Sequence, residues 1–96
     1  WTLLTGERGE FELARGNRAA ASKLLTTMQG FANDGLMLSE QVWDGKGSGS
    51  GRAGSGTGSA TPLAWSMAQF IRLAVNLQAG YNTETPRIVL ERYRAR

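Results

Sequence analysis

Residues 61–80 read TPLAWSMAQFIRLAVNLQAG, and this stretch decides the expected fold. Thr61 and Pro62 suit the start of a helix and the final glycine suits its end, so the pattern predicts a helix that runs to Ala79. Apolar side chains cover nearly its whole circumference, and Arg72 is its only charge. A helix that is apolar all round is normally buried on several sides.

The rest of the chain is too short to bury such a helix on all sides. The chain has 96 residues, and periodic apolar positions predict two further helices over 2–15 and 18–32. Two glycines, Gly6 and Gly9, weaken the first of these helices. We therefore expect an all-α piece of a larger helical body and not an independent fold. The inner ring of a double-ring α barrel would supply such surroundings.

Two further segments complete the chain. Residues 45–58 are rich in Gly and Ser, which is typical of a flexible loop. The Gly-Lys dipeptide in this loop is not followed by the Ser or Thr that opens a helix in a phosphate-binding loop. The tail over 81–96 contains Pro86 and is predicted to be an extended segment with one short turn.

The composition excludes several kinds of site. The chain has no histidine and no cysteine, so it offers no His-based triad, thiol nucleophile or thiolate metal site. No uncharged apolar stretch reaches about 18 residues, so we expect no membrane span. The net charge is +3, but the arginines near the end lack the interleaved aromatics of a nucleic-acid surface. We expect a solvated chain end, with no metal and no nucleic-acid partner.

A second stretch carries the candidate chemistry. Residues 35–44 read GLMLSEQVWD and follow an Asn-Asp-Gly turn signal. This loop puts the carboxylate of Glu40 beside the amide of Gln41 and close to the indole of Trp43. Such a loop can hold a base next to a flat, hydroxyl-rich ring.

Three sequence blocks in fixed order carry a family resemblance. They are WTLLTGERG over 1–9, the loop around Glu40, and SATPLAWS over 59–66. Together they resemble the C-terminal part of the catalytic domain of glycoside hydrolase family 15, the inverting exo-glucosidases that include glucoamylases and glucodextranases. The chain departs from the family at Thr2, where relatives commonly carry proline, and at Met67, where they often carry histidine or tyrosine. These departures concern the finer sugar specificity.

The resemblance implies a fold and a reaction. Residues 1–96 would be the C-terminal portion of an (α/α)6-barrel catalytic domain, with the Gly/Ser-rich loop at 45–58. The complete enzyme would release glucose from the non-reducing ends of starch-type or dextran- and isomaltose-type α-glucans, with inversion. Glu40 would be the general base that activates water. Inversion also needs a carboxylic acid roughly 6.5–9.5 Å from the base, and in this family that acid lies on an upstream segment absent from this chain.

Polar neighbours of the base have two interpretations each. Ser59 lies six residues before Trp65, the offset at which the resemblance implies a serine that hydrogen-bonds the base. A donor there would orient the Glu40 carboxylate and favour its ionised form. The alternative is an ordinary cap or loop serine. Gln41 either fixes the loop or contacts sugar hydroxyls.

The three tryptophans are candidates for the walls of a sugar site. A pyranose ring packs its C–H groups on an indole face, and the indole N–H is a donor. Trp1 matches a family position that lines the sugar cleft, and we expect it to do so here. Trp65 lies near the start of its helix and Trp43 lies close to the base. For both of these residues, a core role and a sugar contact remain open.

Alternatives to the glucoamylase interpretation stay open at this point. Family 15 trehalases tend to carry Ser-Glu-Glu where this chain has Ser-Glu-Gln. A non-catalytic helical binding module would need a polar face on the helix over 62–79, and the sequence lacks one. The resemblance implies no cofactor here, admits a structural calcium elsewhere in the complete enzyme, and favours a secreted or periplasmic location while leaving a cytoplasmic one open. The expected partners are an α-glucan or α-glucoside substrate and the remainder of the same catalytic domain.

Overall fold

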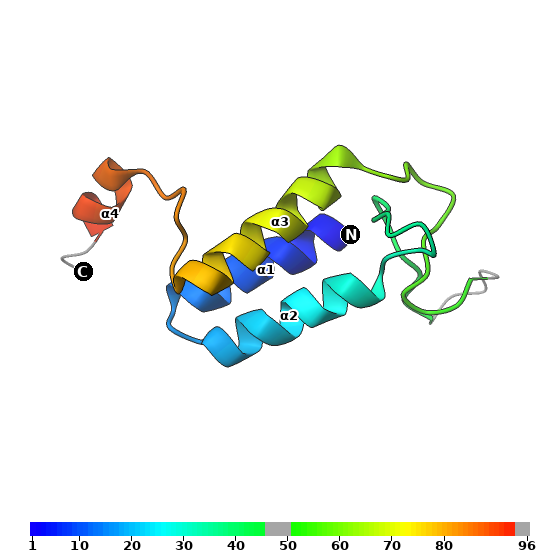
Figure 1. Ribbon diagram of the computed structural model, residues 1–96, viewed down its shortest axis with the longest axis horizontal. Helices are drawn as coiled ribbons and strands as arrows, with labels where there is room; N and C mark the ends of the chain where they lie inside the picture. The colour runs from blue at the N-terminus through cyan, green and yellow to red at the C-terminus, as the bar shows by residue number, and fades with distance from the viewer. Residues whose placement is uncertain (46–50, 94–96) are drawn as a thin grey trace.

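The computed structural model describes residues 1–45 and 51–93 and is all-α, as predicted (Figure 1). The sequence-based prediction for residues 46–50, part of the Gly/Ser-rich loop, lies outside the described residues, as does the end of the tail. Within the described ranges, no helix is long and apolar enough to cross a membrane. The helices found there are α1 (Thr2–Ala14), α2 (Arg18–Gly30), α3 (Ala64–Ala79) and α4 (Arg87–Tyr93).

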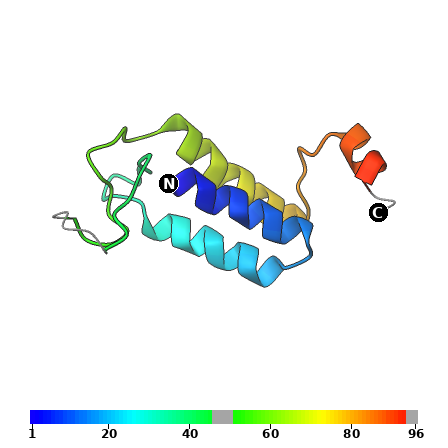
Figure 2. The same cartoon turned by 180° about the vertical axis from the view of Figure 1, so that it is seen from behind.

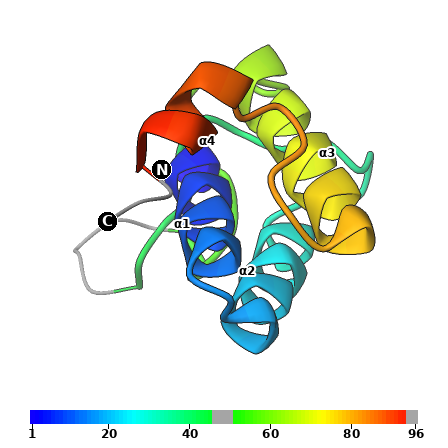
Figure 3. The same ribbon diagram turned by 90° about the vertical axis from the view of Figure 1, so that its left-hand side faces the viewer.

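Three of the helices form a bundle. A tight turn joins α1 to α2, so these two helices run antiparallel, and α3 returns beside them parallel to α1 (Figures 1 and 2). Seen from its end, the bundle is a triangle in which α1 packs against both other helices (Figure 3). Helix α1 therefore lies at the centre of the packing, although its glycines made it the weakest of the predicted helices.

Local signals set most of the helix boundaries. Asn17 caps α2, because its side-chain oxygen accepts a hydrogen bond of 3.2 Å from the backbone N–H of Ala20. Gly80 ends α3 in the left-handed conformation, with φ of 87°, and its N–H donates to the carbonyl of Asn76 at 2.8 Å. The predicted end of this helix is therefore confirmed.

The predicted start of α3 is wrong by two residues. The helix begins at Ala64 with Leu63 as its N-cap, and Pro62 precedes it in the loop. The N–H of Leu63 donates to the carbonyl of Leu38 at 2.9 Å. This long-range hydrogen bond holds the segment before Ala64 against the loop that follows α2. Local helix-start signals cannot reveal such a contact.

The tail also differs from its prediction. Residues 87–93, expected to be mainly extended, form the two-turn helix α4. No residue of α4 is buried, and it packs against none of the other described helices. Figure 1 shows it beyond the end of the bundle where α3 stops. Pro86 supports this helix, because its carbonyl accepts the N–H groups of Val89 and Leu90 at 2.9 and 3.1 Å.

Two glycines allow α1 and α3 to pack closely. A Cβ atom at Gly9 would lie 2.5 Å from a methyl carbon of Leu73, and one at Gly6 would lie 2.5 Å from Cγ of Gln69. Both glycines are buried, and the side chains of Leu73 and Gln69 are almost completely buried. The glycines that weaken α1 as an isolated helix are therefore the residues that let α3 approach it.

Helix α3 presents an unexpected face to the bundle. Its buried side carries three polar residues, Ser66, Gln69 and Asn76, beside leucines. Its apolar residues Trp65 and Ile71 are instead exposed in this chain. The sequence predicts that this helix is covered on several sides. In this chain only the face that carries the polar residues and leucines is covered, and the apolar stripe is exposed.

A charged network holds the far end of α3. The Arg72 guanidinium donates to the Glu84 carboxylate at 2.7 and 2.9 Å and lies 3.4 Å from the Glu10 carboxylate. The amide of Asn76 donates to both carboxylates, at 3.0 and 3.1 Å. Burial and the contact with Glu84 raise the pKa of Glu10. Burial alone would also raise the pKa of Glu84, but hydrogen bonds from Arg72 and Asn76 outweigh it and lower that pKa to about 2.

The first prediction concerns the isolated chain. Its radius of gyration is 14.9 Å, whereas a compact chain of this length would have about 12.5 Å. Large apolar side chains remain exposed on three helices, including Phe11, Ile71 and Ile88. We expect the 96-residue chain expressed alone to be insoluble or molten, with strong binding of a hydrophobic dye. A sharp calorimetric transition with dispersed amide NMR signals would contradict this.

The second prediction tests the close packing of α1 on α3. In the complete protein, Gly9→Ala should be destabilising, because the new methyl group overpacks buried Leu73 at a cost of about 1–3 kcal/mol. This cost exceeds the gain in helix propensity of about 1 kcal/mol. Gly30→Ala is the matched control, since nothing lies within 4 Å of a Cβ at that helical glycine. Thermal unfolding should show a lower Tm for Gly9→Ala and an equal or higher Tm for Gly30→Ala.

Candidate active site

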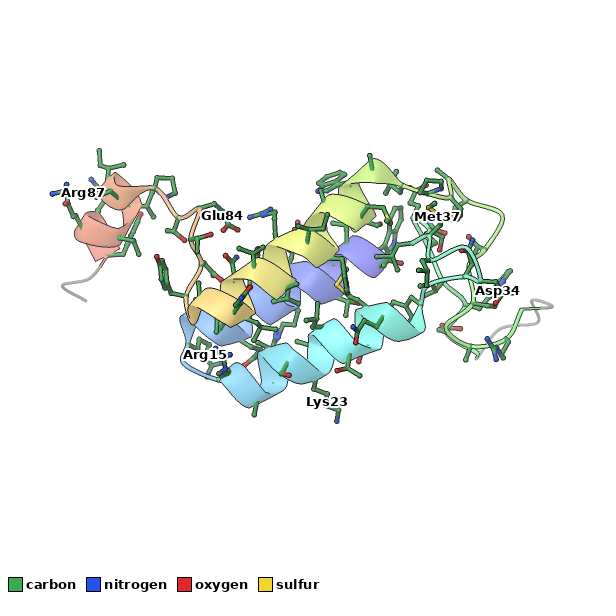
Figure 4. The ribbon with its side chains drawn as sticks, viewed as in Figure 1. Arg15, Lys23, Asp34, Met37, Glu84 and Arg87 are labelled. Atoms are coloured by element: carbon green, nitrogen blue, oxygen red, sulfur yellow. The ribbon has the colours of Figure 1, made fainter. Side chains whose placement is uncertain are left out.

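The loop that carries Glu40 lies at the end of the bundle where α1 and α3 begin. The backbone N–H of Thr2, the first residue of α1, donates to the carbonyl of Glu40 at 3.2 Å. Figure 4 shows Asp34 and Met37 of the same loop at this end, while Arg15 and Glu84 lie at the other. The charged network of Glu84 is therefore separate from the candidate site.

A short antiparallel pairing holds the segment around Glu40 in place. The N–H of Glu40 donates to the carbonyl of Ala60 at 2.9 Å, and the N–H of Thr57 donates to the carbonyl of Gln41 at 3.0 Å. Further along, Trp43 exchanges backbone hydrogen bonds of 2.9 and 2.8 Å with residues 54–55. Residues 54–60, which include the end of the Gly/Ser-rich loop, thus run back along residues 40–43 and hold the backbone of the candidate base.

Side-chain hydroxyls complete the support of this segment. The Ser39 hydroxyl donates to the carbonyl of Gln41 at 2.7 Å and so spans Glu40. The Ser66 hydroxyl, on α3, donates to the carbonyl of Ser39 at 3.2 Å. The Glu40 side chain is half-buried. Among the described residues its carboxylate makes no hydrogen bond or ion pair, while the peptide groups on both sides of it are hydrogen-bonded.

Ser59 lies beside the candidate base but contacts its backbone. Its hydroxyl oxygen accepts the N–H of Gln41 at 3.1 Å and lies 2.8 Å from the Thr57 hydroxyl. In the described chain no hydrogen bond joins Ser59 to the Glu40 carboxylate. Ser59 therefore orients the loop through Gln41, and its hydrogen bond to the carboxylate stays a prediction.

Two of the three tryptophans flank this end of the bundle. Trp1 caps α1 and Trp65 lies in the first turn of α3, and their side chains are 58% and 61% exposed. Such exposure leaves indole faces open to a ligand, and neither side chain fills the core of this chain. Trp43 is half-buried. A Cβ at Gly51 would lie within 2 Å of its ring, so the loop closes over one side of this indole.

The residues that sequence reasoning missed are the supports of Glu40. Thr2, Ser39 and Ser66 are buried, at 0%, 1% and 0% exposure. The sequence contains one signal for Ser39 and Ser66, because both lie inside the blocks that carry the family resemblance, whereas Thr2 is a position at which the chain departs from the family. Their partners are far away along the chain, however, and no periodic pattern pairs residues 2 and 40 or 39 and 66.

The pocket nearest to the loop is unsuited to a sugar. It measures about 360 Å³ and lies between the end of α2, the loop and α3. Its lining is apolar apart from one residue, Gln29, so sugar hydroxyls would find few partners there. Within the described residues no group of three or more acidic side chains could hold a metal ion. The lining residues are Met28, Gln29, Ala32, Leu36, Leu38, Met67 and Phe70.

Comparison with known proteins identifies the class to which this helical chain and its loop belong. The family model of the glycosyl hydrolases family 15 matches residues 1–75. A glucoamylase from Clostridium sp. (strain G0005) is 40% identical over 96 residues, which is all of this chain and 12% of that protein. The crystal structure of a bacterial glucoamylase complexed with acarbose is 39% identical, with a TM-score of 0.84, and the match covers 97% of this chain and 12% of that one.

The chain therefore belongs to family 15 of the glycosyl hydrolases. Its helices reproduce an all-α piece of the glucoamylase fold, as the sequence predicted. It spans 12% of the length of each of these two relatives.

The third prediction tests Trp1 as a sugar wall. In the complete catalytic domain, Trp1→Ala should lower kcat/KM by roughly 10- to 150-fold, because losing the apolar contact of a large side chain costs about 1.5–3 kcal/mol. The Tm should change little, because a wall of a sugar cleft contributes less to stability than a core side chain does. Trp1→Phe keeps a ring and should retain more activity. An unchanged kcat/KM together with a large fall in Tm would assign Trp1 to the core.

Proposed function

We propose that this chain supplies the general base of an inverting, exo-acting α-glucoside hydrolase that releases glucose from the non-reducing ends of α-glucans. Glu40 is the base. It removes a proton from the water that attacks the anomeric carbon, on the face opposite to the leaving group. Family membership supports hydrolysis of a glycosidic bond, and the arrangement around Glu40 supports this particular role.

One observation carries the proposal. Glu40 combines a rigid backbone with a carboxylate that has no partner in the described chain. A carboxylate with a structural role is normally engaged, as those of Glu12 and Glu84 are, in ion pairs with Arg8 and Arg72. A general base must instead keep its lone pairs available to a water molecule, at a fixed place, until substrate arrives.

The sugar site is proposed to include Trp1 and Trp65. These two exposed indoles lie at the start of α1 and α3, the end at which Glu40 is held. Stacking of a pyranose on one indole face would place its hydroxyl groups within reach of polar neighbours such as Gln41. The related bacterial glucoamylase was crystallised with acarbose, and we propose that this chain contributes to the same kind of site.

The acid partner of the reaction is proposed to lie outside this chain. Inversion requires a second carboxyl group roughly 6.5–9.5 Å from the base. Glu10 and Glu84 cannot serve, because both belong to the network around Arg72 at the far end of α3. The remainder of the catalytic domain would supply the acid and cover the exposed apolar residues Ile71 and Val75 of α3. No cofactor is needed for this reaction.

The fourth prediction tests the base. In the complete enzyme, Glu40→Gln should keep the fold and substrate affinity but lower kcat by roughly 10²–10⁴-fold, the usual contribution of a positioned general base. The acid limb of the pH–rate profile should flatten, because that limb reports protonation of the base. Glu7→Gln, at an exposed position on α1, is the matched control and should behave like the native enzyme.

The products provide a second measurement. Proton NMR of fresh product should show β-glucose from the native enzyme, since inversion converts an α-glucoside into the β-anomer. Azide added to Glu40→Gln should restore part of the turnover and yield β-glucosyl azide. Near-native activity in Glu40→Gln with an intact acid limb would refute the proposal and leave Asp44 as the next candidate. Parallel assays with maltotriose, isomaltose and trehalose would assign the linkage and separate a glucoamylase from a trehalase.

A further inference from the structure

The two peptide groups that flank the Cα of Glu40 are fully hydrogen-bonded. In the group before it, the carbonyl of Ser39 accepts the Ser66 hydroxyl at 3.2 Å and the N–H of Glu40 donates to Ala60 at 2.9 Å. In the group after it, the carbonyl of Glu40 accepts the N–H of Thr2 at 3.2 Å, and the N–H of Gln41 donates to Ser59 at 3.1 Å. Both backbone torsions of Glu40 are therefore held from outside its own loop turn.

The four partners come from two sources. Two, Ser59 and Ala60, belong to the segment that runs back along residues 40–43, and two belong to the first turns of α1 and α3. A loop held only by another loop can shift as one body relative to the helices. The contacts from Thr2 and Ser66 instead tie the loop to the rigid bundle, where the exposed indoles of Trp1 and Trp65 also start.

We infer that Ser66 is a positioning residue for Glu40, which fixes the base in the frame of the helix that carries Trp65. Thr2 adds a second tie, to α1, that is particular to this chain, because the proline that relatives commonly carry there has no N–H. This inference rests on the proposed role of Glu40 as the general base. The quantity that these residues would control is the distance between the carboxylate of the base and the bound sugar. Reacting groups must be held within about 0.5 Å of the productive geometry, and a misplacement of about 1 Å can cost roughly 100-fold in rate.

Burial distinguishes these residues from ordinary surface hydroxyls. Ser66 is 0% exposed and lies on the polar face that α3 turns toward the bundle. An alanine there would fit the space and suit the helix, but it would leave the Ser39 carbonyl without its side-chain donor. The backbone N–H of Thr2 would be unpaired within the helix in any case, because the first N–H groups of a helix have no internal acceptor.

The fifth prediction is the test of this inference, made in the complete catalytic domain. Ser66→Ala should lower kcat by roughly 10- to 100-fold, with KM changed less than about threefold and with the acid limb of the pH–rate profile retained. Ser66→Thr keeps the hydroxyl and should recover most of the lost kcat. Thr26→Ala is the control, since it removes an exposed hydroxyl that donates to a backbone carbonyl within α2, remote from the loop.

A second variant tests the other helix. Thr2 is the first residue of α1, a position where proline is well tolerated by a helix. Thr2→Pro therefore deletes the N–H that reaches Glu40 while sparing the helix, and it introduces the residue that relatives commonly carry. It should lower kcat less than Ser66→Ala does and leave the acid limb intact. Ser66→Cys, which nearly keeps the side-chain volume but donates only weakly, keeps the inference testable if Ser66→Ala does not fold, and it should also lower kcat.

The outcomes separate this inference from the proposed function. If Glu40→Gln is nearly inactive while Ser66→Ala and Ser66→Cys keep native kcat, the base stands and the positioning role is overturned. If Glu40→Gln is fully active, both the proposed function and the positioning role are overturned. A loss of kcat in Ser66→Ala that Ser66→Thr does not restore, or that matches its loss of folded protein, also overturns the inference. A fall in kcat with the acid limb and Tm preserved supports it.

Discussion

The close contact of α1 with α3 is the constraint on which the rest of this structure depends. Gly6 packs on Gln69 and Gly9 packs on Leu73, and neither contact has room for a Cβ atom. The two contacts advance in the same direction along both helices, so the helices are parallel and their first turns lie at the same end. The two glycines of α1 thus determine where the first turn of α3 lies relative to α1.

The candidate site is a consequence of that alignment. Because both helices start at one end, the N–H of Thr2 and the hydroxyl of Ser66 reach neighbouring carbonyls of one loop. The indoles of Trp1 and Trp65 start from the same two turns. A change in the packing of α1 on α3 would therefore alter both the position of Glu40 and its distance from these two indoles.

The sequence predicted those parts of the structure that local signals control. It placed three helices almost at their observed bounds, since caps and glycine stops act over a few residues. It misplaced the start of α3, because a hydrogen bond from Leu63 to Leu38 overrides the local proline signal. It also missed that α3 buries its polar residues, since the need of Asn76 to bind Glu10 and Glu84 exists only in the folded chain.

The same reasoning explains why Glu40 could be chosen from the sequence while its supports could not. Glu40 stands in a motif whose residues are adjacent, so a resemblance can carry it. Its supports come from positions 2, 59, 60 and 66, which only the folded backbone brings together. The chemistry of a general base belongs to one side chain. The position of that side chain depends on the hydrogen bonds made by the two peptide groups beside it. A sequence motif can identify the residue, and only a structure can reveal the hydrogen bonds that hold it.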